Sequence, residues 1–266
     1  MPYPIAMIPY TNMAPYRELG EPLGCRFISC VPSKSISMLK NGQVLAAAVP
    51  VGGIPVLNGL VDYMGNFGIG AKEKSKSVLF FSDRPFHEFR IPAKMFLTSD
   101  SASSVRLLYL LISYNQGFDD FPQQIKDPLQ ANGELIIGDA ALNKIRDYHL
   151  LKSANTRSDD KPVYITDLAT EWYKQHKLPF VFARWIIRKD APLKAKKAMA
   201  DWLAEFKERE AELVQAAVPE AARRLGIPEA EILDYFKVIR RTMTDEDLKG
   251  QELFLKEIMN HDYKYQ

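Results

Sequence analysis

The sequence predicts an α/β fold in which two lobes enclose a ligand cleft, followed by a helical C-terminal tail. Short apolar segments typical of buried strands alternate with segments of helical periodicity. A polar linker at 83–91 separates two such units, and one late apolar run, Phe180–Ile187, leads the chain back to the first unit. We therefore expect lobe I at 1–88 and 184–266 and lobe II at 89–183, with a ligand between them.

The first unit contains four apolar runs that are typical of strands. They are Ile5–Ile8, Cys25–Val31, Val44–Val49 and Ser77–Ser82. Pro32 and Ser33 favour the start of a helix, because proline suits a first turn and serine caps free N–H groups. We expect a turn at Pro50-Val51-Gly52-Gly53 and a tight loop at Asn66–Ala71, which contains two glycines. Strands that alternate with helices also predict mostly parallel sheets.

The second unit begins at Ala93 and repeats the alternation of strand and helix. Its predicted strands are Lys94–Leu97 and Glu134–Ile137, and its predicted helices are Val105–Tyr114, one from Ala140 and one from about 167 to 175, with a polar loop at 155–161. Beyond the return strand we expect only helices, because the remaining apolar residues have helical spacing. The expected helices are Pro192–Ala217, Pro219–Leu225, one from Pro228 and Thr244–Met259.

The composition excludes several classes of protein. Hydrophobic residues make up 47% of the chain, which excludes wholesale disorder, and Lys plus Arg exceeds Asp plus Glu by only 35 − 33 = 2, which argues against nucleic-acid binding. Met1–Asn12 lacks a basic start and an apolar core, so we expect no signal peptide, and no run is long enough to span a membrane. We therefore expect a soluble, cytoplasmic protein rather than an exported transport receptor.

The sequence contains no motif of a common catalytic centre. A Walker loop, a Gly-x-Ser-x-Gly elbow and a His-Glu-x-x-His pair are all missing, and the four histidines are scattered. No spacing of potential ligands suits a metal ion, so we expect neither a metal nor a cofactor. The expected partner is a small molecule.

Neutral hydrogen-bonding residues gather at turns that precede predicted helices. Helix N-termini attract anions through free N–H groups and the helix dipole, and hydroxyl groups extend that reach. Several such turns converging on one cleft would suit a small molecule with carboxylates. The alternative for each serine is to cap its helix only, and Asp139 either caps its helix or holds a ligand hydroxyl. The candidates are Thr11, Asn12, Ser33, Ser35, Ser99, Ser101, Ser103, Ser104, Gly138 and Asp139.

Arg184 is a charged residue inside the return strand, which is otherwise apolar. Arginine is almost never fully buried unless it is paired, so Arg184 should face either a carboxylate partner or the cleft. A structural ion pair and a role in ligand binding are both open at this point. We include Arg184 among the candidate substrate-binding residues.

Five segments together resemble one known family. They are Ile8-Pro9-Tyr10-Thr11-Asn12, Ser77–Ser82, the serine-rich Ser99–Val105, Ile136–Leu142 with its Gly138-Asp139 step, and Asp167–Trp172 continued by Leu178–Ala183. In this order they resemble the chorismate dehydratase family of the futalosine route to menaquinone. The resemblance covers about residues 5–188, and it implies a fold of the type II periplasmic-binding-protein kind.

The resemblance also implies a reaction and roles for residues. Chorismate would lose water to give 3-[(1-carboxyvinyl)oxy]benzoate, driven by aromatisation. Asn12 would contact the substrate near its enolpyruvyl group, Asp139 would line the opposite lobe, and both are our candidate catalytic residues. Hydroxyls of Ser77, Ser101 and Ser104 would bind carboxylate and hydroxyl oxygens. Because none of the neutral residues is an obvious base, we hypothesise that the enolpyruvyl carboxylate of the substrate itself takes the C3 proton.

Two positions depart from the pattern of the family. After the third strand the pattern has Ser, an apolar residue and Glu, whereas this chain has Pro50-Val51-Gly52-Gly53. Arg184 stands where the family often has an apolar residue. These departures keep an alternative open, namely a non-catalytic cytoplasmic binder of a small aromatic or dicarboxylic anion on the same scaffold.

Overall fold

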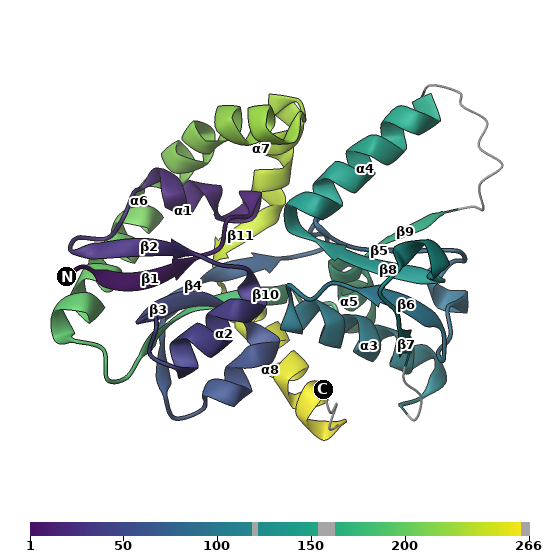
Figure 1. The fold of residues 1–266 in the computed structure, drawn as a ribbon, viewed down its shortest axis with the longest axis horizontal. Helices are drawn as coiled ribbons and strands as arrows, with labels where there is room; N and C mark the ends of the chain where they lie inside the picture. The colour runs from purple at the N-terminus through teal and green to yellow at the C-terminus, as the bar shows by residue number, and fades with distance from the viewer. Residues whose placement is uncertain (119–121, 154–162, 262–266) are drawn as a thin grey trace.

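The chain forms two β-sheets with helices on both faces of each, one sheet in each lobe (Figure 1). The computed structural model describes residues 1–118, 122–153 and 163–261, so the predicted polar loop at 155–161 lies outside the described residues. The predicted α/β architecture with two lobes is confirmed. Among the described residues, no helix combines the length and the apolar character needed to cross a membrane.

The sheet of lobe I has the strand order β11-β4-β10-β3-β1-β2. Its strands are β1 (Tyr3–Met7), β2 (Cys25–Ser29), β3 (Ala46–Pro50), β4 (Val61–Ala71), β10 (Phe180–Arg188) and β11 (Ile239–Thr242). β1 pairs in parallel with β2 and β3, whereas β10 lies antiparallel between β3 and β4. The return strand predicted at 180–187 is therefore a central strand of lobe I.

The sheet of lobe II has the strand order β7-β6-β8-β5-β9. Its strands are β5 (Val78–Ser82), β6 (Lys94–Leu97), β7 (Gln123–Gln124), β8 (Gly133–Ile137) and β9 (Tyr164–Asp167). β5 runs antiparallel to both of its neighbours, β8 and β9. The chain thus enters lobe II in the connection from β4 to β5. It leaves lobe II after the helix that follows β9, in the connection that leads to β10.

The helices cover both faces of the two sheets. In lobe I they are α1 (Ala14–Glu18), α2 (Pro32–Lys40), α6 (Leu193–Leu225), α7 (Glu229–Val238) and α8 (Asp245–Asn260), and in lobe II α3 (Ala102–Gln116), α4 (Gly138–Ser153) and α5 (Leu168–His176). Short 3₁₀ helices are η1 (Thr11–Met13), η2 (Val51–Leu57), η3 (Phe86–Glu88) and η4 (Pro128–Gln130). Because α8 packs against both β10 and α3, the C-terminal region joins the two lobes (Figure 1).

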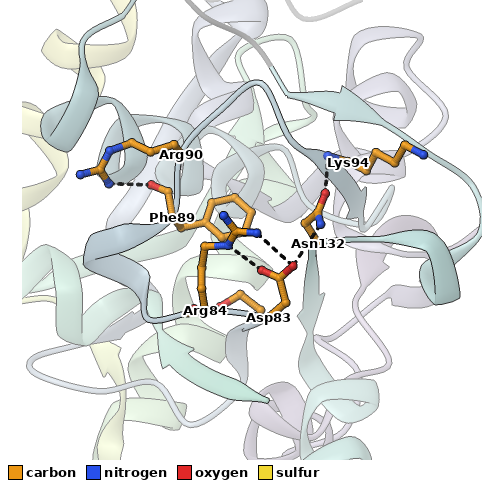
Figure 2. Close-up of polar contacts among 7 residues, drawn as sticks. Asp83, Arg84, Phe89, Arg90, Lys94 and Asn132 are labelled. Carbon is orange, nitrogen blue, oxygen red and sulfur yellow. Dashed lines mark hydrogen bonds and ion pairs between the residues drawn. The ribbon is translucent and has the colours of Figure 1, made fainter. Parts of the chain in front are cut away.

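The predicted boundary between the lobes was misplaced by one strand. We expected the strand at 77–82 in lobe I and a linker at 83–91, but β5 lies in the sheet of lobe II and the crossing comes before it, between Ala71 and Val78. The segment after β5 is a loop within lobe II. Asp83 holds it in place by accepting hydrogen bonds from Arg84 and from the Asn132 side chain, while Asn132 also accepts from the Lys94 amide (Figure 2). An apolar run shows that a strand is buried, but it does not show in which sheet.

The expectation of mostly parallel sheets was wrong, because both sheets are mixed. Each crossing between lobes brings the chain in from the opposite side, so the first strand after it, β5 or β10, runs against its neighbours. The glycine-containing segment at 66–71 is also not a loop but the end of β4. A Cβ at Gly68 would lie 2.2 Å from the carbonyl oxygen of Ala183, so a glycine here permits close approach of two backbones.

Two further differences lie in the C-terminal tail and in lobe II. The short strands β11 and β9 were not predicted, because each has only four residues and carries charged or polar side chains. The predicted break at Pro219 is absent, since α6 continues through it. Buried residues on both sides of Pro219, from Ala217 to Ala222, keep this part of α6 packed against the protein, which outweighs the lost backbone hydrogen bond.

An aromatic cluster fixes α1 and α6 on the sheet of lobe I. The ring of Tyr16 stacks on Phe206 with centroids 3.9 Å apart and lies 5.6 Å from both Trp185 and Trp202. Phe206 is completely buried. Because Tyr16 follows the loop after β1 by only a few residues, this cluster anchors the segment that forms one wall of the cleft.

We expect Phe206→Ala to lower the free energy of unfolding by about 3–5 kcal/mol, because it removes a buried ring and leaves a cavity beside Tyr16. Leu193→Ala, in the same helix but with Leu193 83% exposed, should change it by less than about 0.5 kcal/mol. Urea denaturation followed by circular dichroism measures both. Equal stability of the two variants would contradict this account of the core.

Candidate functional site: a cleft between the lobes

A cavity that is partly open to solvent lies between the two lobes. Its walls come from the loop after β1, the end of β3, the middle of β10, the segment before β5, the start of α3 and the β8–α4 junction. The lining residues are Ile8, Tyr10, Asn12, Met13, Pro32, Ala48, Pro50, Ile69, Ser75, Ser77, Val78, Ser101, Ser104, Ile137, Gly138, Phe182, Ala183 and Ile239. Five of the sequence-predicted residues therefore meet at one place: Asn12, Ser77, Ser101, Ser104 and Gly138.

The cavity lining is apolar apart from a small set of neutral polar groups. These are the Asn12 amide, the hydroxyl of Tyr10 and the hydroxyls of Ser75, Ser77, Ser101 and Ser104. Within the described part of the chain, no lining residue carries a charged side chain. Such a site binds by shape and by neutral hydrogen bonds, and it provides no side chain that is an efficient general base near neutral pH.

The side chain of Asn12 lines the cavity and contains an acceptor without a protein partner. Its Oδ1 atom is buried and has no hydrogen-bond partner. Buried polar atoms in folded proteins are almost always hydrogen-bonded, so an unpartnered amide at a cavity wall points to a ligand as the missing partner. The backbone of Asn12 is held from behind, because its carbonyl oxygen accepts a hydrogen bond of 3.3 Å from Arg241 Nε.

Ser101 and Ser104 form a hydroxyl pair at the N-terminus of α3. The Ser101 Oγ accepts from the Ser104 amide at 3.1 Å, so Ser101 is the N-cap of the helix, and the two hydroxyl oxygens are 3.0 Å apart. For Ser101, capping and lining are thus not alternatives, because the same side chain does both. A helix N-terminus that carries two hydroxyls at a cavity wall favours an anionic ligand group.

Ser77 and Ser75 lie on the segment that leads into β5. The Ser77 Oγ accepts a hydrogen bond of 3.0 Å from the hydroxyl of Tyr235, a residue of lobe I. Burial raises the pKa of Tyr235, so its hydroxyl stays protonated and donates. Ser75 was missed by the sequence analysis; its Oγ donates to Asp167 at 3.1 Å, and only the neighbouring Ser77 hinted at it.

Gly138 has a positive φ of +61° and lies against the ring of Tyr10. A Cβ at Gly138 would be 2.7 Å from that ring, so only glycine permits this contact. The Tyr10 hydroxyl in turn donates to Asp100 Oδ2 at 2.7 Å. Tyr10, which the sequence analysis did not single out, therefore joins lobe I to lobe II at the cavity.

Five predicted residues have other partners and do not line the cavity. One is buried Ser35, whose hydroxyl donates to the Pro32 carbonyl at 2.6 Å. The Ser33 amide donates to the carbonyl of Asp100, and exposed Ser99 lies 3.5 Å from Asp100 Oδ1. The Ser103 hydroxyl accepts from the Gly52 amide at 2.9 Å and donates to the Phe182 carbonyl at 3.1 Å. Thr11 is fully buried beneath the cavity. The contacts of Ser33 and Ser103 tie lobe I to lobe II.

Asp139 also stands outside the lining, although its neighbour Gly138 belongs to it. Its Oδ1 accepts the Thr11 amide at 2.8 Å, and its Oδ2 accepts Arg224 Nη1 at 2.6 Å. Both carboxylate oxygens thus have protein partners. Arg224 completes the arrangement by donating from Nη2 to the Thr11 hydroxyl at 2.7 Å.

Arg184 faces neither a carboxylate nor the cavity, contrary to both alternatives. Its guanidinium donates to the carbonyls of Gly65 and Phe67 and to Gln251 Oε1, at 2.6, 3.2 and 2.8 Å. Only 3% of Arg184 is exposed. Carbonyl groups of the irregular part of β4 therefore satisfy this charge, so Arg184 is a structural residue of the sheet.

The departure at Pro50-Val51-Gly52-Gly53 forms the end of β3 and the first part of η2 rather than a simple turn. Pro50 lines the cavity, and the Gly52 amide donates to Ser103 of lobe II at 2.9 Å. The carbonyl oxygen of Gly52 accepts from Arg106 Nη1 at 2.7 Å. The segment thus connects the lobes through its backbone.

Comparison with known proteins places the chain in a family. The sequence model of the family described as "Menaquinone biosynthesis" matches residues 3–259. The chain belongs to this family. A curated relative named chorismate dehydratase, from Thermus thermophilus, is 27% identical over 95% of this chain and 94% of its own. The resemblance inferred from the five sequence segments is confirmed.

Solved structures confirm the fold. A protein of Archaeoglobus fulgidus superposes with a TM-score of 0.71 at 12% identity, covering 97% of each chain. The periplasmic aliphatic sulphonate binding protein SsuA of Escherichia coli superposes with a TM-score of 0.64 at 12% identity, covering 99% of this chain and 94% of its own. The predicted periplasmic-binding-protein-like fold is therefore confirmed for this member of the menaquinone biosynthesis family.

We expect Arg184→Met to lower the free energy of unfolding by about 2–4 kcal/mol, because two backbone carbonyls and the Gln251 amide lose a buried donor. Arg84→Met, which breaks only the exposed pair with Asp83, should change it by less than about 0.5 kcal/mol. Urea denaturation measures the difference. If the Arg184→Met protein were stable but bound the ligand more weakly, Arg184 would instead be a residue of the ligand site.

Proposed function

We propose that this protein is a carbon–oxygen lyase that dehydrates chorismate to 3-[(1-carboxyvinyl)oxy]benzoate in menaquinone biosynthesis. Membership of the menaquinone biosynthesis family supports the pathway, and the name of the relative from Thermus thermophilus supports the reaction. The observation that carries the proposal is the neutral cavity between the lobes, whose Asn12 amide oxygen has no protein partner.

The chemistry demands little from the protein beyond orientation. The hydroxyl at C4 and the hydrogen at C3 leave as water, and the ring becomes aromatic, which supplies the driving force. Positioning of reacting groups alone contributes up to about 7–11 kcal/mol to a reaction barrier in the best cases. A preformed cavity without a charged catalytic residue is consistent with a reaction in which orientation is the main requirement.

A base is still needed for the C3 proton, and in our proposal the substrate provides it. No carboxylate, histidine or lysine side chain lines the cavity within the described residues. The enolpyruvyl group of chorismate is an ether on C3 itself, so in our proposal its carboxylate reaches the C3 proton within the same molecule. The role of the cavity is then to hold that carboxylate in the reactive orientation and to exclude water.

The polar groups of the cavity have three roles in this proposal. Asn12 contacts the enolpyruvyl end of the substrate, because an amide offers both a donor and an acceptor. The Ser101–Ser104 pair at the start of α3 binds the ring carboxylate, with help from the helix dipole. Ser77, held by Tyr235, binds a hydroxyl oxygen.

The purified protein should convert chorismate without any added cofactor. Ultraviolet absorbance follows loss of the cyclohexadiene, and mass spectrometry should find a product lighter by one water. Asn12→Ala should lower kcat by about 10²–10³-fold, since it removes an oriented polar group at the reacting end of the substrate. Ser99→Ala, at an exposed position outside the cavity, is the matched control and should leave kcat unchanged. Stoichiometric binding without turnover would favour the non-catalytic binder.

Asp139→Asn tests the source of the base. If the substrate carboxylate takes the proton, kcat should fall less than about tenfold, because the amide still accepts from Thr11 and no proton acceptor is lost. Steady-state kinetics with chorismate and a separate binding titration are the measurements. Loss of turnover with intact binding would make Asp139 the base and would end the hypothesis of a self-deprotonating substrate.

A further inference from the structure

An ion pair bridges the two lobes just behind the cavity. Arg224 lies in the last turn of α6 in lobe I, and Asp139 lies in the first turn of α4 in lobe II. Their closest atoms are 2.6 Å apart, and the carboxylate of Asp139 is 16% exposed against 39% for the Arg224 side chain. In Figure 1, α4 faces α7 and the end of α6 across the gap between the lobes.

The ion pair is closed into a ring by Thr11. The Thr11 amide donates to one oxygen of Asp139, and the Thr11 hydroxyl accepts from the second Nη atom of Arg224. Thr11 has no exposed surface. Each of the three residues therefore bonds to both of the others, so the loop after β1 cannot leave lobe II without breaking contacts at Asp139.

The position of Thr11 connects this ring to the cavity. It directly precedes Asn12, the residue with the unpartnered amide. Tyr10, on the other side of Thr11, bonds to Asp100 in lobe II at 2.7 Å and packs on Gly138. The two residues before Asn12 are thus fastened to lobe II. The cation that closes the ring, Arg224, comes from a distant part of the chain.

Electrostatics favour the closed arrangement. The Arg17 guanidinium donates to the carbonyls of Ile8 and Tyr10 in the same loop. Burial lowers the pKa of Arg17, and the nearby charge of Arg224 lowers it further, whereas Asp139 opposes the shift. Separation of the lobes would leave two cations near each other without the carboxylate between them, which is unfavourable.

We propose that Arg224 is a positioning residue for the reaction: by binding Asp139 and Thr11 together, it holds the lobes closed and so places Asn12 against the substrate. The inference rests on the proposed function for its kinetic part. Neither Arg224 nor Asp139 touches the substrate, and Asp139 acts through the backbone of Thr11 rather than as an acid or base. Arg224 is then needed for productive binding and not for the chemical step.

This role has a defined kinetic signature. When only the closed protein binds productively, the apparent dissociation constant rises as the closed fraction falls. Saturating substrate restores closure, so KM should change and kcat should not. We expect Arg224→Gln to raise KM by roughly threefold to thirtyfold, with kcat within about threefold, because a partly exposed interlobe pair contributes a modest energy.

A matched control lies one residue away. Arg223 is also in the last turn of α6, but it pairs with Glu220 of the same helix and is 76% exposed. Arg223→Gln removes the same charge and should leave KM and kcat unchanged. Arg224→Lys should recover part of the effect, since one ammonium group reaches Asp139 but lacks the planar fork that also serves Thr11.

Asp139→Asn and the double variant test whether the two residues act as a unit. If they do, Asp139→Asn combined with Arg224→Gln should raise KM no more than Arg224→Gln alone. Multiplied effects on KM would show independent roles and would contradict the proposal. A high ionic strength should also raise the KM of the unaltered protein towards that of Arg224→Gln, because salt screens a partly exposed pair.

Hydrogen exchange of the Thr11 amide gives a readout without substrate. This amide donates to Asp139, so its exchange in the free protein should be several-fold faster in Arg224→Gln than in Arg223→Gln, measured by mass spectrometry of the 8–13 peptide or by NMR. Equal exchange in both variants, or a fall in kcat with KM unchanged, would overturn the proposal. Failure of the unaltered protein to convert chorismate would reject the proposed function alone, since the exchange difference would still report the contact.

Discussion

The architecture depends on the insertion of β10 between β3 and β4. This strand is the second of the two connections between the lobes, and it pairs antiparallel with β3 and β4, so Ala183 lies opposite both Pro50 and Ile69. All three residues line the cavity, together with Phe182. The hydrogen bonds of one strand therefore fix the floor of the site and the geometry of the crossing at the same time. Arg184, the next residue, stabilises the arrangement by binding carbonyl groups of β4 from inside the sheet.

A substrate with two carboxylates can be bound either by ion pairs or by neutral hydrogen bonds, and this cavity offers only the second kind within the described residues. Full ion pairs inside the cavity would bind the anion strongly, but they would also neutralise the carboxylate that our proposal requires as a base. Hydroxyl groups and a helix N-terminus attract the carboxylate through hydrogen bonds and the helix dipole, but they do not protonate it. Arg241 adds a cation outside the lining: it is fully buried, its Nε binds the carbonyl of Asn12, and Glu210 lies 3.7 Å away. The positive charge of Arg241 thus acts on the site through the backbone of the loop after β1, and not by direct contact with a ligand.

The sequence predicted those features that depend on local order. Apolar runs located β1, β2, β3, β6, β8 and β10, and hydroxyl-rich turns located Ser101 and Ser104 at the start of α3. It misplaced features that depend on pairing between distant segments. The sheet to which β5 belongs and the course of β4 past Gly68 are set by strand partners, which no local pattern reveals. Arg184 illustrates the same limit, because backbone carbonyls rather than a side chain accept its hydrogen bonds.

The C-terminal tail holds the loop that carries Asn12. Three of its residues reach that region: Arg224 bonds Thr11, Arg241 bonds Asn12 and Tyr235 bonds Ser77. Two of these contacts bridge more than two hundred positions of the sequence, so only the folded chain reveals them. Because a neutral site acts through orientation, residues that orient its loop matter as much as residues that touch the ligand. The long final helices are therefore part of the catalytic apparatus in our proposal. Among the described residues of the tail, Ile239 of β11 alone lines the cavity.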